Sequence, residues 1–166
     1  MDAQEILFRD GVALGMCAKF RDSWGVPNTA ELAHKMFAGM DFCIEHDYPK
    51  LSLLQQLYTP QETELYGIYI ADGTSRGQSN ICALGDSKVH IYVPAYGVCD
   101  IYARHNSKIH LHLCEKSFCY LSILDNSQII VETKAEGAQL KASYFGGTIE
   151  TPELFDTIHD KTNKEA

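Results

Sequence analysis

Hydrophobic and polar positions follow two different periods along the chain, and the change falls near residue 60. Before it, apolar side chains recur every three or four residues, as on one face of an amphipathic helix. After it, apolar and polar residues alternate, as in a half-buried strand. The pattern predicts an α+β protein with a helical N-terminal region over 1–60 that caps a β-rich region over 61–150.

Three helices are expected in the N-terminal region. The first runs from Asp2 to about Phe20, and the third covers Lys50 to Tyr58. The second begins at Asn28, since Asn28 and Glu31 have the spacing of a capping box. At the other end of the chain, the segment Thr151-Pro152-Glu153 predicts a short C-terminal helix, followed by a tail, over 151–166.

Residues 78–137 consist of three rows of twenty residues with matching chemistry at aligned positions. The rows read QSNICALGDSKVHIYVPAYG, VCDIYARHNSKIHLHLCEKS and FCYLSILDNSQIIVETKAEG, and a partial fourth row runs from Ala138 to about Glu150. A fixed period with two strand-like segments per row is typical of a β-solenoid, whose coils bury their apolar sides against one another. The sequence therefore predicts a short parallel β-solenoid (β-helix) with 20-residue coils. A β-sandwich or meander is the alternative, because antiparallel strands alternate as well.

The aligned rows also predict where individual side chains lie. The inward-facing set comprises Ile81, Ala83, Val89, Ile91, Val93 and their equivalents. Cys99 and Cys119 share an inward column and are expected to form a thiol pair, with a disulfide as the alternative. Lys141 falls in the apolar column of Leu121, which predicts a bulge or an early exit there. The first strand is expected over Leu65 to Ala71, and residues 74–79 read as a loop.

Charge and composition narrow the choice of partners and compartment. The formal net charge is −8 and is spread evenly, which argues against nucleic acid and anionic membranes as partners. No apolar run approaches the roughly eighteen residues of a membrane span, and the N-terminus has no signal-peptide pattern. Six cysteines without a Cys-x-x-Cys pair suit a reducing compartment, so we expect a cytoplasmic protein.

The outward columns of the predicted solenoid carry the residues that are best suited to bind a metal ion or a partner. His90 lies beside His110 in one column, and Tyr92, His112 and Glu132 form the next. His110 and His112 are two apart on one strand, so their side chains share a face about 7 Å apart. The three imidazoles could bind zinc, although a solvated strand face or a binding face uses the same residue types.

Three classes of function remain open from the residues. The leading expectation is a non-enzymatic binding or assembly protein, in which a rigid solenoid face meets a protein partner or a second copy. The first alternative is a metal-binding protein or enzyme that uses His90, His110, His112 and Glu132. The second is a carbohydrate-active β-helix protein, although the rows show no convergent pair of carboxylates for acid–base catalysis. No phosphate-binding loop or nucleophile elbow is present, so enzymatic activity is not expected.

The segment from Glu31 to Tyr58, above all DFCIEHDYP at 41–49, resembles one found in short uncharacterised bacterial proteins of prophages and mobile elements. Those proteins combine a helical N-terminal region with short β-repeats, and the resemblance covers roughly Cys17 to Ile70. It implies a bacterial, phage-related setting. It carries over no functional residue, because the similar proteins have no assigned activity.

Overall fold

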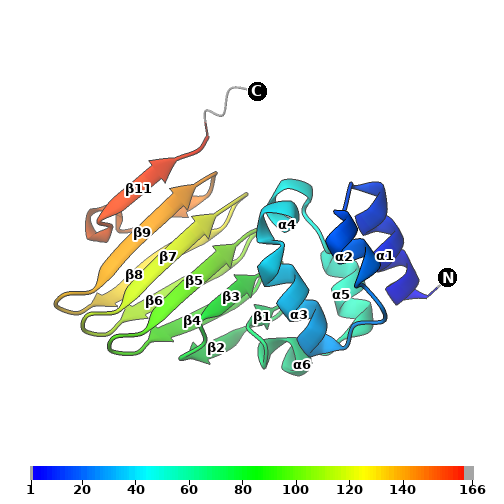
Figure 1. Ribbon diagram of the computed structural model, residues 1–166. Helices are drawn as coiled ribbons and strands as arrows, with labels where there is room; N and C mark the ends of the chain where they lie inside the picture. The colour runs from blue at the N-terminus through cyan, green and yellow to red at the C-terminus, as the bar shows by residue number, and fades with distance from the viewer. Residues whose placement is uncertain (1, 163–166) are drawn as a thin grey trace. The chain divides into compact units, whose positions relative to one another are not determined.

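The computed structural model describes residues 2–162 and divides the chain into two compact units, Met1–Tyr66 and Gly67–Ala166 (Figure 1). The first unit is helical, and the second is built from parallel strands that stack as a β-solenoid. The predicted α+β class and the solenoid are thereby confirmed. The division falls at residue 66 rather than 60, because a further short helix precedes the first strand.

The helical unit contains shorter helices than the sequence pattern suggests. They are α1 (Ala3–Ala13), α2 (Ala18–Asp22), α3 (Thr29–Ala38), α4 (Met40–His46), α5 (Leu51–Leu57) and α6 (Pro60–Glu64). The capping box at the start of α3 is confirmed, since the Asn28 side chain accepts from the Glu31 N–H and the Glu31 carboxylate accepts from the Asn28 N–H. The first expected helix is two helices, because Gly15, at φ +98°, ends α1 in a left-handed conformation.

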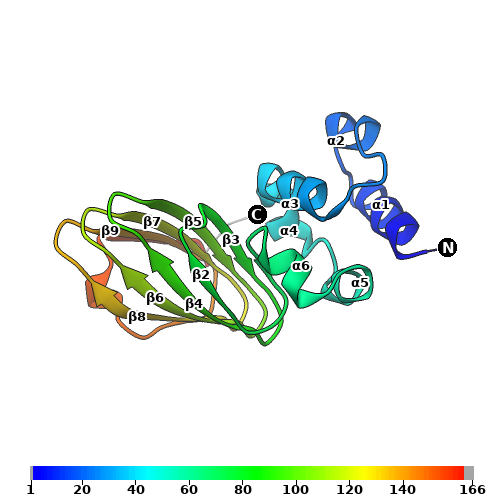
Figure 2. The same ribbon diagram turned by 90° about the horizontal axis from the view of Figure 1, so that it is seen from below.

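The second unit consists of two parallel sheets that face each other (Figure 2). Each turn of the chain adds one strand to each sheet, so neighbours within a sheet are every second strand in sequence. Sheet A contains β1 (Ile68–Tyr69), β3 (Asn80–Ala83), β5 (Val98–Ala103), β7 (Phe118–Ile123), β9 (Gln139–Tyr144) and β11 (Thr157–Asp160). Sheet B contains β2 (Gly73–Arg76), β4 (Lys88–Val93), β6 (Lys108–Leu113), β8 (Gln128–Lys134) and β10 (Thr148–Ile149).

One apolar core fills the space between the two sheets. The inward residues named for the first row and their equivalents in the second row are all buried and belong to it, with Val89 beside Ile109 and Ile109 beside Ile129. In the third row Thr133, at the position of Val93, is exposed. Because the period of a strand is two, burying one set of side chains presents the alternate set to solvent. The register of the core therefore also fixes which side chains stand next to one another on the outer faces.

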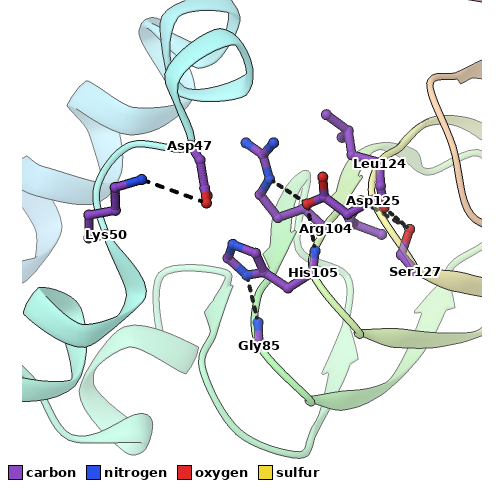
Figure 3. A network of polar contacts seen from close by, with 9 residues as sticks. Asp47, Lys50, Gly85, Arg104, His105, Leu124, Asp125 and Ser127 are labelled. Atoms are coloured by element: carbon purple, nitrogen blue, oxygen red, sulfur yellow. Dashed lines mark hydrogen bonds and ion pairs between the residues drawn. The ribbon is translucent and has the colours of Figure 1, made fainter. Parts of the chain in front are cut away.

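The corners after β3, β5 and β7 each place one residue in the left-handed region. Gly85, His105 and Asp125 occupy this column, with φ of +65°, +59° and +56°. The Asp125 carboxylate accepts from the Arg104 Nε and the His105 backbone N–H, at 3.0 and 2.9 Å, and the His105 Nδ1 accepts from the Gly85 N–H (Figure 3). Burial alone would raise the pKa of Asp125, but these hydrogen bonds outweigh it and the pKa is lowered. The corner polar residues thus bond from coil to coil.

The irregularity expected at Lys141 lies earlier in the chain. Leu111 pairs with Val131 and His112 pairs with Thr133, so Glu132 is an extra residue in β8. The insertion moves the following strand by one position, and Lys141 pairs with the outward-facing Tyr120 instead of the buried Leu121. A charged side chain is thereby kept out of the core.

The predicted C-terminal helix is wrong. Pro152–Leu154 form a single 3-10 turn, and the chain then returns as β11, which pairs in parallel with β9. Parallel pairing with the last coil satisfies the backbone of β9 more completely than a short helix would. The part of the predicted tail at 163–166 lies outside the described residues.

The start of the solenoid also differs from expectation. The strand predicted over 65–71 is reduced to Ile68–Tyr69, since Gly67 before it has φ of +86°. Residues 73–76, which the sequence pattern assigns mainly to a loop, form β2 and pair with β4. Sheet B therefore begins one strand earlier than the repeat suggests.

Candidate binding face

The outer face of sheet B brings together six side chains from four strands, which we call the ladder face. Its members are Arg76, His90, Tyr92, His110, His112 and Glu132. Arg76 pairs with Tyr92 and Tyr92 with His112, while His90 pairs with His110 in the column alongside. The five residues that the sequence predicts as a binding face therefore lie on one surface, and β2 adds Arg76.

The rings of the ladder face stack on one another along the solenoid. Tyr92 and His112 have ring centroids 4.2 Å apart and planes 7° apart. His90 and His110 are 4.5 Å and 14° apart. These distances are close to the strand spacing of about 4.8 Å, so the rings follow the coil repeat.

Arg76 ends the tyrosine column with a cation. Its guanidinium carbon lies 4.1 Å from the centroid of the Tyr92 ring. Stacking of this kind holds a guanidinium flat and leaves its N–H groups at the edge for hydrogen bonding. Within residues 2–162, no carboxylate forms an ion pair with Arg76, so its donors are available to a ligand.

Glu132 places an anion beside His110, the last histidine of its column. The sequence places it in one column with His112, but the bulge changes this, and Thr133 is the residue beside His112. The Glu132 carboxylate instead lies 2.7 Å from the His110 Nδ1. This hydrogen bond lowers the pKa of Glu132. Bulges re-aim side chains in this way, and here the bulge joins a carboxylate to the edge of the ring stack.

His112 has the most unusual environment of the three histidines. Its Nε2 is buried without a hydrogen-bond partner among the described residues. Burial lowers the pKa of His112, and the nearby His90, His110 and Arg76 lower it further, against an opposing effect of Glu132. The surroundings of His112 therefore favour the neutral form of its imidazole.

The stacking of the rings also affects whether the histidines could bind a metal ion. Nitrogen lone pairs lie in the plane of an imidazole, so parallel stacked rings direct theirs side by side rather than toward one point. A tetrahedral zinc site needs ligands that converge. In the part of the chain that the structure describes, no group of three His, Cys, Asp or Glu side chains is arranged to hold a metal ion.

The carboxylates considered for sugar chemistry are spread over different places. Asp86 and Asp125 lie at corners, where they accept hydrogen bonds from Asn106 and Arg104. Asp100 stands on sheet A, where burial raises its pKa. Glu132 stands on sheet B, so the structure does not bring Asp100 and Glu132 together on one face.

The paired cysteines behave as the sequence predicts. Cys99 and Cys119 are in register, fully buried and present as free thiols. Burial, followed by the neighbouring Cys99, raises the pKa of Cys119 well above its ordinary value. The pair is thus an unreactive part of the core.

Arg76 is the member of the ladder face that the sequence pattern does not predict. Its strand has only one buried side chain, Ser75, so no apolar alternation announces it. The repeat does not identify it either: extending the 20-residue rows backward places Asp72 beside Tyr92, whereas the structure pairs Arg76 with Tyr92, because the link between β2 and β3 is four residues shorter than its equivalent in the next coil.

Comparison with known proteins identified no relative of the chain. No family model, no curated protein and no solved structure matches the chain. The resemblance of the Glu31–Tyr58 segment to prophage-associated proteins stays a prediction. None of the helices in the described range has the length and hydropathy of a membrane span.

Proposed function

We propose that this protein is a non-enzymatic assembly protein that self-associates through the ladder face. The observation that carries the proposal is the ring stack, which has the Arg76 guanidinium at one end and the Glu132 carboxylate at the other. The core fixes the register of the strands that carry the ladder face, so the face loses little conformational entropy when it binds.

The positions of the two charges favour a second copy as the partner. Arg76 on β2 and Glu132 on β8 are separated by three strand spacings, about 14 Å. A two-fold axis through the middle of the face brings Arg76 of each copy opposite Glu132 of the other. Such isologous pairing is the commonest way in which identical chains associate. Complementary charges at an interface also select the correct partner and register.

Charge reversal tests this proposal. Native mass spectrometry and sedimentation velocity at micromolar concentration should show a dimer of the wild-type protein that survives EDTA. Arg76→Glu and Glu132→Arg should each shift the population to monomer, because each places like charges opposite one another. The double variant should restore the dimer. Lys19→Glu, on an exposed residue of α2, makes the same change of charge elsewhere and should leave the dimer intact.

Three results would overturn the proposal. The first is a monomeric wild-type protein, and the second is a dimer unaffected by either single reversal. The third is a dimer that dissociates in EDTA, which would assign the three histidines to metal binding. Circular dichroism of each variant separates loss of association from loss of fold. A cytoplasmic location and a bacterial, phage-related role belong to the same proposal. Cysteine usage supports the first, and the resemblance of the Glu31–Tyr58 segment supports the second.

A further inference from the structure

The helical unit contains an apolar pocket that the ladder face does not involve. Its volume is about 150 Å³, and it lies within residues 15–48. The main lining side chains come from α2, α3, α4 and the segments that flank them: Met16, Phe20, Trp24, Met36, Phe42 and Tyr48. An apolar cavity of about this volume is large enough for a six-membered ring.

The polar groups of the lining are mostly committed to the protein itself. The Tyr48 hydroxyl donates to the Leu7 carbonyl at 2.7 Å, and burial raises the pKa of Tyr48. The Cys43 thiol donates to the Met36 carbonyl. A ligand body inside the pocket therefore meets apolar surface and is held by its exclusion from water.

Lys35 is the one charged residue in the lining. Its Nζ lies 5.6 Å from the centroid of the Trp24 ring and donates to the Ser23 carbonyl at 3.1 Å. An ammonium has three N–H donors, so two remain. Within residues 2–162 no carboxylate pairs with Lys35; Glu31, one helical turn earlier, is held by the backbone N–H and side-chain amide of Asn28.

The surroundings of Lys35 point to an anionic ligand. Lys35 is half-buried at the wall of an apolar pocket, where a charge interacts more strongly than in water. We infer that the pocket binds a small carboxylate whose apolar body has about six to eight carbons, with the body among the aromatic and methionine side chains and the carboxylate on Lys35. The inference is independent of the proposed assembly.

Trp24 supplies a direct readout, because it is the only tryptophan of the chain and lines the pocket. Cyclohexanecarboxylate, which does not absorb in the tryptophan range, should change the Trp24 fluorescence of the full-length protein in a saturable way. Cyclohexylmethanol and cyclohexylmethylamine have the same ring with a neutral and a cationic head. We expect both to bind at least tenfold more weakly than the carboxylate.

Three variants connect the preference to Lys35. Lys35→Met should remove the tenfold difference between carboxylate and alcohol, whereas Lys35→Arg should retain it because the positive charge stays. Lys19→Met, on a lysine outside the pocket, should bind as the wild type does. The inference is overturned if no probe gives a saturable change, if the alcohol binds as well as the carboxylate, or if Lys35→Met keeps the preference. Urea unfolding confirms that each variant is folded.

Discussion

The three histidines of the ladder face share one type of position and differ in environment. Each stands on an outward position of a sheet B strand, yet only His112 has a buried, unpartnered ring nitrogen. His110 bonds to Glu132, and His90 stacks on His110. Position in the repeat therefore gives the direction of a side chain, while its neighbours decide its chemistry.

Acidification should destabilise the protein through His112. Its pKa is lowered in the folded state, so between that value and the unfolded value of 6.5 the unfolded chain binds more protons. Stability is therefore fully present above pH 6.5 and is lost as the pH falls through this window. Glu132 stays ionised there, because its pKa is lowered from 4.5.

The urea midpoint of the wild type should thus fall between pH 7.5 and pH 5.5. His112→Tyr retains a ring on Tyr92 and removes the titration, so its midpoint should fall less. His34→Tyr, on an exposed position of α3, is the matched control and should behave as the wild type. Equal acid sensitivity of His112→Tyr and wild type would contradict the assignment.

At the scale of elements, an insertion and a deletion cancel within one turn of the solenoid. Glu132 adds a residue to β8, and the corner Phe145–Gly147 has one residue fewer than Leu124–Ser127. As a result Thr148 and Ile149 return to register with Gln128 and Ile129. The short corner places Gly147 at φ +88°. The Cα hydrogen that a side chain would replace faces the Ser127 carbonyl oxygen.

Gly147→Ala should destabilise the solenoid by about 2 kcal/mol or more. A non-glycine residue in the left-handed region costs roughly 1–2 kcal/mol, and a Cβ here would lie 2.3 Å from the Ser127 carbonyl oxygen, so the backbone must shift. Gly77→Ala, at φ +81° with open space around it, is the control for the backbone cost alone. Urea denaturation measures both; equal losses would show that the corner can relax around the methyl group.

Across the whole molecule, the six cysteines differ in burial. Cys17 and Cys114 are exposed, and the other four are buried as free thiols. A thiol reacts as its thiolate, which burial disfavours. Low accessibility and a raised pKa therefore both reduce the reactivity of Cys119. Reactivity toward an aromatic disulfide therefore reports the packing of both units.

Two thiols per chain should react rapidly with such a reagent in the native state, and six in denaturant. The double variant Cys17→Ser/Cys114→Ser should lose the rapid phase without losing its fold. Intact mass under non-reducing conditions provides a second check, because a Cys99–Cys119 disulfide would lower the mass by two hydrogens. A third rapid thiol, or that lower mass, would contradict the structure of the core.

Much of the fold could be predicted from the sequence because the information is local or repeated. The helix start at Asn28 follows from a cap spaced by three residues, and the solenoid follows from a period of twenty that puts Ile109 beside Val89 and Ile129. Stacking of identical coils then fixes the register, which predicts that His90, Tyr92, His110 and His112 share one face.

Only the tertiary structure decided where the period fails and what the face contains there. The sequence alone is compatible with an irregularity at Glu132 or at Lys141. The structure has it at Glu132, because a bulge there keeps the charged Lys141 side chain out of the apolar core. Leu154, Phe155 and Ile158 form an apolar stripe that suits a helix, but the open backbone of β9 pairs with Thr157–Asp160 as a strand. The sequence by itself determined the repeat and its outward columns; the tertiary structure added Arg76, joined Glu132 to His110 and buried the Nε2 of His112, because these depend on contacts between coils.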